Sequence, residues 1–214
     1  MKAAIRFILV LSVLGGATAG SAEFIADYWG FSDEAMIDTE IIQMGFVTEV
    51  FAPLTYDPVN FQYTYALDGV QLDQVIPMGP STLYLYLGGF FSIYEDASFN
   101  AVYDDGACTV SDPSTFADGS LYLQAQVDTL TWIVNSFTGR GSYDAVMLYV
   151  GGSNIDEIPL SERGGTLFGG TTDQTATACI PSGYLHRWDG QAFTLQIPTP
   201  VGTSTWGSVK ALYH

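Results

Sequence analysis

Clustered carboxylates are the first residues of this sequence that could do chemistry. The densest group lies within eleven residues, and its members are Glu95, Asp96, Asn100, Asp104 and Asp105. Calcium in proteins takes about six to eight oxygen ligands, and an acidic loop can supply several of them. The group lacks the D-x-D-x-D-G spacing and the final Glu of an EF-hand, and Asp and Asn also favour turns through local hydrogen bonds. The segment therefore predicts either a calcium site or a plain turn.

An aromatic stripe near residue 186 is the second candidate site. Tyr184, His186 and Trp188 alternate with other residues, so in a strand they would share one face. Aromatic rings stack on the apolar faces of sugars, which predicts a carbohydrate platform, but the same stripe is also typical of a hydrophobic core. A Ser-His-Asp triad would have to use His186, because the other histidine, His214, ends the sequence. The alternative is a histidine packed within an aromatic cluster.

Motifs of the common hydrolases are absent, since the sequence contains neither H-E-x-x-H nor G-x-S-x-G. Glycoside hydrolysis requires only two carboxylates, and Glu49 is the first candidate. In a strand it shares a face with Val47 and Phe51, and apolar neighbours would raise its pKa. The alternative is the solvent face of an edge strand. We therefore predict a protein without catalytic function.

Two cysteines, Cys108 and Cys179, remain to be explained. An even pair in an oxidising compartment predicts one disulfide. It would close a loop of about 70 residues, which stabilises the fold by roughly 4 kcal/mol in the chain-entropy model. The alternative, a reactive thiol or a metal ligand, lacks a nearby histidine or second cysteine.

The N-terminus is typical of a secretory signal peptide over residues 1–22. Two basic residues precede an apolar run over residues 7–14, which is too short to cross a bilayer. Small residues follow, and cleavage is predicted after Ala19 or Ala22. We therefore expect a secreted, periplasmic or cell-surface protein whose folded body spans residues 23–197.

The sequence is strongly acidic, with 23 Asp and Glu against 6 Lys and Arg. Removal of the signal peptide takes away Lys2 and Arg6, so the formal charge of −17 becomes −19. Phosphate binding requires clustered basic residues, which excludes nucleic acid and anionic lipid as expected partners. No later apolar run approaches the ~18 residues of a membrane helix, so no membrane span is expected after signal removal. The acidity favours either solubility outside the cell or calcium binding.

Alternating apolar and polar residues, punctuated by Asp-Gly and Gly-Gly pairs, predict strands and turns throughout the body. Asp68-Gly69 and Asp189-Gly190 each predict a two-residue hairpin turn, and Gly88-Gly89 predicts a further turn. Apolar residues switch from odd to even positions near Asp128-Thr129. A side chain cannot change faces without an extra residue, so this switch predicts a β-bulge or a sharp bend.

The strand pattern predicts an all-β fold. We expect a single antiparallel β-sandwich domain of about ten strands in a jelly-roll-like layout, with a closed β-barrel as the alternative. A hydrophobic content of 48% and the length of the body suit one packed domain. Helical periodicity appears only in short pieces, such as residues 33–37, which Ser32 could cap.

The tail over residues 198–214 begins with Pro198 and Pro200, which stop a strand. Its end reads Trp206-Gly207-Ser208-Val209-Lys210-Ala211-Leu212-Tyr213. Apolar residues there share one face of a short helix. The segment resembles a W-G-x-V-K-x-L-Y peptide that recurs at the ends of secreted bacterial proteins, which implies a sorting or anchoring role.

The body also resembles the β-rich ectodomains of bacterial surface proteins of the PEP-CTERM kind. The resemblance lies in residues 92–96 and 116–121. The sequence departs from that pattern because it has no Pro-Glu-Pro, no terminal membrane helix and no basic tail. The resemblance implies an exported bacterial protein and transfers no functional residue.

These observations predict an exported, non-catalytic β-domain that acts as a surface or extracellular structural or binding protein. Its expected partner is a glycan or a component of the cell envelope. The alternatives are a calcium-dependent carbohydrate-binding module and a polysaccharide-acting enzyme on a jelly roll.

Overall fold

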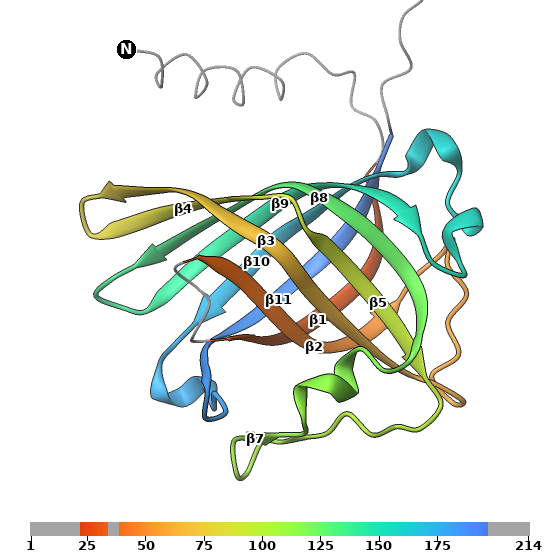
Figure 1. The fold of residues 1–214 in the computed structure, drawn as a ribbon, viewed down its shortest axis with the longest axis horizontal. Helices are drawn as coiled ribbons and strands as arrows, with labels where there is room; N and C mark the ends of the chain where they lie inside the picture. The colour runs from red at the N-terminus through yellow and green to blue at the C-terminus, as the bar shows by residue number, and fades with distance from the viewer. Residues whose placement is uncertain (1–21, 34–38, 197–214) are drawn as a thin grey trace, which may run out of the picture.

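The computed structural model describes residues 22–33 and 39–196 (Figure 1). The predicted signal peptide, apart from Ala22, and the predicted C-terminal tail therefore lie outside the described residues. The helix predicted after Ser32 also falls outside them, except for Asp33, which is the last residue of a strand.

Eleven β-strands make up most of the described chain. The main sheet contains β1 (Glu23–Asp33), β2 (Glu40–Val50), β3 (Gln62–Met78), β4 (Ser81–Leu87), β5 (Phe90–Asp96), β8 (Ser120–Asn135), β9 (Arg140–Gly151), β10 (Gly164–Asp173) and β11 (Tyr184–Leu195). A small second sheet contains β6 (Tyr103–Asp104) and β7 (Thr109–Val110). The loops hold the short 3-10 helices η1 (Pro113–Phe116), η2 (Ile155–Glu157), η3 (Leu160–Glu162) and η4 (Ala176–Ala178). The described residues include no α-helix, and within these ranges no helix could cross a membrane. The predicted all-β class is confirmed.

The main sheet closes on itself through backbone hydrogen bonds. Its order is β2-β1-β11-β10-β9-β8-β4-β3-β5, and the further pairings β2–β3 and β8–β5 join its ends. All of these strand pairs are antiparallel. The sequence predicted antiparallel strands packed face to face. In the structure, one continuous closed antiparallel sheet provides the faces that oppose one another. Figure 1 shows its strands wrapping around a common interior.

Strands β4 and β5 form one interrupted strand between β3 and β8. Strand β3 pairs with β5 as far as Asp68 opposite Phe90, and with β4 from Gln71 opposite Leu87 onward. Gly88-Gly89 joins the two halves with φ values of 74° and 79°. The turn predicted there is wrong, because the chain continues between the same two neighbours.

Asp68-Gly69 lies beside this interruption and bends β3 instead of forming a hairpin. Gly69 has a φ of 68°, a value that glycine adopts readily. A Cβ added to Gly89 would meet the carbonyl oxygen of Asp68, so the two backbones approach closely. The predicted hairpin is wrong. The left-handed conformation of Gly69 instead allows β3 to kink at the point where its neighbour changes from β5 to β4.

The bulge predicted near Asp128-Thr129 is confirmed. The register between β8 and β9 shifts between Val127 and Thr129. At the same point the other neighbour of β8 changes from β5 to β4. The amide of Gly88 donates to the carbonyl oxygen of Asp128 at 3.4 Å, so the bend in β8 adjoins the interruption between β4 and β5.

Asp189-Gly190 lies inside β11, so the second predicted hairpin is also wrong. Strand β11 pairs with β1 and β10 on both sides of this dipeptide. A Cβ on Gly190 would meet the hydroxyl groups of Tyr143 and Tyr28. Glycine is therefore needed at this position for space in the interior.

Aromatic side chains fill much of the interior. Tyr28, Tyr65 and Trp188 are at most 1% exposed. The rings of Tyr28 and Tyr65 meet edge to face at 4.8 Å, and the hydroxyl of Tyr143 donates to that of Tyr28 at 2.7 Å. Burial of one such ring contributes about 2 kcal/mol, so these residues supply a large part of the stability.

The loops gather at two ends of the closed sheet. One end, which we call the hairpin end, holds the connections 79–80, 136–139 and 174–183, and the opposite end holds the rest of the long loops. Residues 97–119, which we call the excursion, leave the opposite end and pack on the outer face of the sheet. There Phe116 and Ala101 form a second, small core with Met44.

The kink at Gly89 provides a test of the closed arrangement. We expect Gly89→Ala to destabilise the fold by about 3 kcal/mol, because the new methyl group meets the Asp68 carbonyl and φ is positive. Gly79→Ala is the matched control, since Gly79 has a φ of 67° but nothing within 4 Å of its Cβ position. That variant should lose only about 1 kcal/mol. Chemical denaturation measures both, and equal losses would contradict the close approach.

Candidate functional site

A groove lies between the excursion and the outer face of β1 and β2. It has a volume of about 430 Å³. Aromatic side chains dominate its walls, and the lining residues are Trp29, Phe46, Thr48, Gln62, Ala101, Val102 and Tyr103. We call it the aromatic groove.

Strand alternation places the first two aromatic rings of the groove. Trp29 on β1 lies directly opposite Phe46 on β2, so both side chains point to the same face. Their ring centroids are 5.1 Å apart. The ring of Tyr103, from the excursion, meets Trp29 edge to face at 5.0 Å. Three segments distant in the sequence therefore build one partly exposed aromatic surface.

The excursion is fixed by polar and apolar contacts beneath the groove. The Gln62 side chain donates to the carbonyl oxygen of Ala101 at 2.7 Å and accepts from its amide at 3.1 Å. The hydroxyl of Thr64 donates to the carbonyl oxygen of Phe116 at 2.9 Å, and the ring of Phe116 contacts that of Phe46 at 5.1 Å. These contacts hold the groove wall against the sheet.

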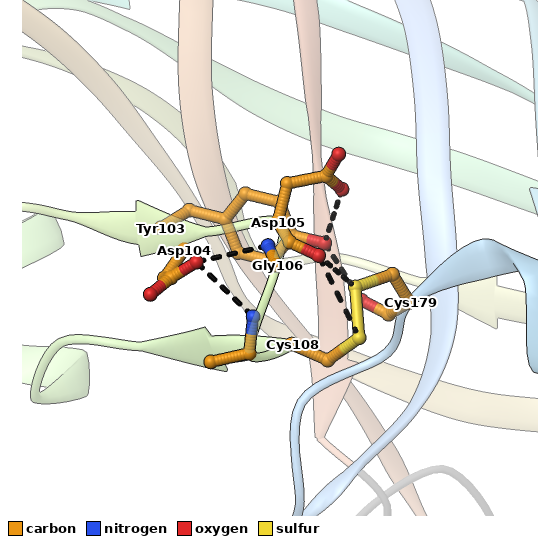
Figure 2. Close-up of a disulfide and its surroundings, with 7 residues drawn as sticks. Tyr103, Asp104, Asp105, Gly106, Cys108 and Cys179 are labelled. Atoms are coloured by element: carbon orange, nitrogen blue, oxygen red, sulfur yellow. Dashed lines mark hydrogen bonds between the residues drawn. A yellow bond between two sulfur atoms is a disulfide. The ribbon is translucent and has the colours of Figure 1, made fainter.

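The predicted disulfide between Cys108 and Cys179 is confirmed and fixes the far side of the excursion. Figure 2 shows it joining the β6–β7 turn to the loop before β11. The hydroxyl of Tyr103 donates to the carbonyl oxygen of Cys179 at 2.8 Å. The disulfide therefore sets the position of a groove residue as well as closing a long loop.

Charged groups surround Trp29 on the outer face. The guanidinium of Arg187 lies over the indole ring, 4.7 Å from its centroid. Asp189 is the cross-strand neighbour of Trp29 on β11. Partial burial raises the pKa of the Asp189 carboxyl, the nearby Asp27 raises it further, and Arg187 opposes them. Burial also raises the pKa of the Tyr103 hydroxyl.

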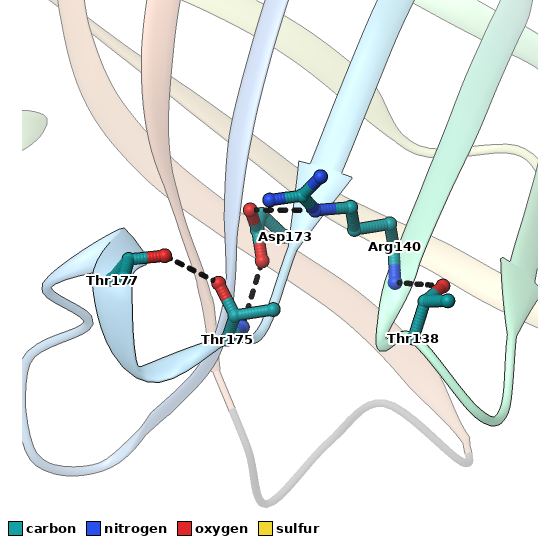
Figure 3. A network of polar contacts seen from close by, with 5 residues as sticks. All are labelled: Thr138, Arg140, Asp173, Thr175 and Thr177. Atoms are coloured by element: carbon teal, nitrogen blue, oxygen red, sulfur yellow. Dashed lines mark hydrogen bonds and ion pairs between the residues drawn. The ribbon is translucent and has the colours of Figure 1, made fainter.

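Arg187 differs from the other two arginines of the described ranges. Figure 3 shows Arg140, whose guanidinium pairs with Asp173 at 3.3 Å at the hairpin end. Asp173 also accepts a hydrogen bond from the amide of Thr175 at 2.7 Å. Arg163 pairs with Asp156 at 3.1 Å. The guanidinium of Arg187 makes no ion pair within the described chain, and it stacks on a groove residue instead.

The predicted sugar platform is divided between the two faces of the sheet. His186 and Trp188 point into the interior and are 2% and 0% exposed. Tyr184 lies on the outer side, where its ring contacts Phe31 at 5.8 Å and its hydroxyl donates to Met44 Sδ at 3.4 Å. A register shift between Ser32 and Asp33, opposite His186 and Tyr184, separates the two faces. These three side chains therefore do not form one exposed platform.

Most of the predicted calcium ligands are engaged in local hydrogen bonds. Asp96 Oδ1 accepts from the amide of Ser98, and Asp104 Oδ1 accepts from the amides of Gly106 and Ala107. Asn100 is bonded to Asp118 and Asp105 to Tyr103, while Glu95 is the penultimate residue of β5. Among the residues that the structure describes, no three His, Cys, Asp or Glu side chains lie close enough to share an ion.

Glu49 is exposed, in contrast to the apolar surroundings considered from the sequence. The register of β2 against β1 shifts between Val47 and Glu49, so the carboxylate turns away from the buried Val47. The Glu49 carboxylate therefore does not lie on the apolar face of β2 that the sequence suggested.

The aromatic groove itself was missed from the sequence. The only sequence signal for it was weak. Aromatic residues occur at both odd and even positions of β1, so that Tyr28 faces inward and Trp29 faces outward. Large aromatic residues on both faces of one strand indicate that the outer face is also covered. Nothing local to β1 specifies that Tyr103 is the covering residue.

Comparison with family models, curated proteins and solved structures finds no match for this chain.

Removal of the disulfide should loosen the groove wall. We expect the Cys108→Ser, Cys179→Ser variant to lose about 4 kcal/mol of stability, because the bond closes a 71-residue separation. Thermal unfolding of the wild type with and without reductant should show a similar loss. Reductant should leave the double variant unchanged, and a wild type insensitive to full reduction would contradict this assignment.

The buried His186 predicts an acid-dependent loss of stability. Burial lowers its pKa from 6.5 to about 4, while Asp173 acts in the opposite direction. Because the unfolded chain binds a proton that the folded chain does not, stability is lost as the pH falls from 6.5 to 4. The loss is about 3 kcal/mol. Denaturation at pH 7 and pH 4 measures it.

His186→Phe serves as the control for this titration, since it keeps an aromatic side chain without a titrating group. Its stability should fall less between pH 7 and pH 4 than that of the wild type. The same pH slope in both proteins would show that other groups dominate this window.

Proposed function

We propose that this chain is an exported, non-catalytic β-domain that binds a glycan in the aromatic groove. The observation that carries the proposal is the meeting of Trp29, Phe46 and Tyr103 around a partly exposed hollow of about 430 Å³. The apolar face of a sugar ring packs on aromatic rings, and a hollow of this volume accommodates one or two sugar units.

Polar groups beside the groove supply the hydrogen bonds that sugar hydroxyls require. Asp27 and Asp189 flank Trp29 on the outer face, where their carboxylates can accept from hydroxyl groups. Arg187 presents donors over the same indole ring. Aromatic stacking combined with a few placed polar groups is the usual composition of a small-molecule site.

A neutral glycan fits the charge of this protein best. The sequence carries 23 acidic and 6 basic residues, so an anionic polysaccharide would be repelled over long range. Asp27 and Asp189 add negative charge beside the groove itself. Arg187 is the one arginine beside the groove. It is better suited to donating hydrogen bonds to a neutral sugar than to offsetting the negative potential of the acidic residues.

The predicted route of export agrees with a role at or outside the cell surface. A signal peptide and a disulfide belong to an oxidising compartment, where envelope and extracellular glycans are accessible. The proposal therefore places the domain on the cell surface, in the periplasm or in the medium, in contact with a polysaccharide or another envelope component.

Titration with neutral oligosaccharides of the gluco, manno, galacto and xylo series tests the proposal. We expect millimolar or tighter binding that Trp29→Ala weakens at least tenfold, because stacking on the indole is lost. Phe137→Ala is the matched control, since Phe137 is 85% exposed in the turn between β8 and β9, away from the groove. Binding should also survive chelation of calcium by EDTA.

Other outcomes distinguish the alternatives. Binding abolished by EDTA would identify a calcium-dependent module, and release of reducing ends would identify an enzyme. Absence of binding to every neutral series, or equal affinity in Trp29→Ala and wild type, would overturn the groove as a glycan site.

A further inference from the structure

The outer side of β9 exposes three large apolar side chains in succession. Residues of β9 alternate between the interior and the outside, and Val146, Leu148 and Val150 all point outward. Their side chains are 51%, 44% and 43% exposed. The solvent-facing residues of an antiparallel strand are ordinarily polar, so these three residues need a separate explanation.

Two further apolar side chains lie on the same face, on the far side of β8. Leu87 on β4 and Phe90 on β5 are 39% and 40% exposed. Only Thr129 and Gln126 of β8 stand between these two residues and the apolar residues of β9. Contiguous exposed apolar surface of this kind commonly marks an interaction site. We call this set the outer apolar face, and its members are Leu87, Phe90, Val146, Leu148 and Val150.

The described part of the chain ends beside this face. Leu195 is the last residue of β11, and Gln196 is the last residue that the structure describes. Leu195 lies opposite Gly164 on β10, and Gly164 lies opposite Leu148 on β9. Residues directly opposite one another share a face of the sheet, so Leu195 also points outward. The distance from Leu195 to Leu148 is two strand spacings, which is about 10 Å.

The tail is long enough to reach every member of the outer apolar face. Trp206, its first aromatic residue, lies ten residues beyond Gln196. An extended segment of that length spans about 33 Å. Phe90 is the most distant member, and four strand spacings, about 19 Å, separate it from Leu195. The linker can therefore bring Trp206 onto this face without being fully extended.

The tail also differs in charge from the rest of the sequence. Residues 198–214 contain no Asp or Glu, and Lys210 is the one Lys or Arg among them. All 23 acidic residues therefore precede the tail. Exposed carboxylates border the outer apolar face, with Asp144 two residues before Val146 on β9 and Asp128 at the bulge of β8. An apolar segment with one positive charge complements an apolar face with an acidic border.

We infer that the tail of this chain covers the outer apolar face, with Trp206, Val209 and Tyr213 packed on β9 and its neighbours. The sequence predicts that these three side chains share one face of a short helix. The linker keeps the tail near the face at a millimolar effective concentration, so contacts that would be weak between separate molecules are sufficient.

This interaction is separate from the proposed glycan site. The outer apolar face lies on β4, β5, β8 and β9, whereas the aromatic groove lies on β1 and β2. A failure of one proposal therefore leaves the other unaffected.

Cleavage by a lysine-specific protease tests the inference, because Lys2 and Lys210 are the only lysines of the sequence and Lys2 lies in the predicted signal peptide. The exported chain is then cut only after Lys210, and mass spectrometry measures the rate. A synthetic peptide of residues 201–214 gives the rate for the same site without the folded body. We expect the folded chain to be cut at least tenfold more slowly than the peptide, since cleavage follows the population in which the site is open.

Substitutions on the face show where the tail lies. Leu148→Gln and Val150→Gln should each raise the cleavage rate at least threefold while the Tm confirms folding, because each removes apolar contact area. Phe137→Gln is the matched control, since Phe137 is 85% exposed at the hairpin end, and its rate should equal that of the wild type. Trp29→Ala should also leave the rate unchanged.

Three results would overturn the inference. The first is equal cleavage of the folded chain and the peptide. The second is a rate that neither variant of the outer apolar face alters, or that Trp29→Ala raises instead, which would place the tail in the aromatic groove. The third is protection that increases with protein concentration, which would assign the face to a second copy of the chain.

Discussion

A strand that pairs on both sides has no free edge, and in this protein the pairings β2–β3 and β8–β5 close the main sheet. Only the end of β3, from Gln74 to Met78, extends past β2 and pairs with β4 alone. Each strand must then point alternate side chains inward and outward around a fixed interior. The interior can be filled only by side chains of matched size, and here tyrosine and tryptophan rings fill much of it, with aliphatic side chains between them. Gly190 shows the constraint directly, since even a methyl group there would meet the hydroxyls of two tyrosines.

Closure also explains why three neighbouring strands bend at one level. Strand β3 bends at Asp68-Gly69, the strand formed by β4 and β5 is interrupted at Gly88-Gly89, and β8 bulges at Asp128. Adjacent strands that remain hydrogen bonded must bend together, because a kink in only one of them would break the ladder. Bulges and glycine kinks are the usual means by which a sheet acquires the curvature needed to close.

The sequence predicted features whose causes are local. The bulge near Asp128 was predicted because the apolar pattern itself changes phase there, and the disulfide because only two cysteines exist. The hairpin turns predicted from the two Asp-Gly pairs were wrong. At Asp68-Gly69 the reason is that a left-handed glycine suits a hairpin turn and a strand kink equally well. At Asp189-Gly190 the reason for glycine is the presence of Tyr28 and Tyr143, which lie far away in the sequence. The aromatic groove could not be predicted for the same reason, since the path of the excursion places Tyr103 beside Trp29.

Strands β1 and β11 carry the aromatic groove on one face and part of the buried interior on the other. On the outer face Trp29 and Arg187 border the aromatic groove, while Ser32 and His186 point into the interior. A substitution that shifts the register of either strand by one residue would exchange these faces and destroy the groove and the interior packing together. Side-chain substitutions can nevertheless act on one face alone, because alternate residues of one strand have separate surroundings. The strand register is thus the common structural requirement, and the chemistry on each face depends on which residues that register exposes.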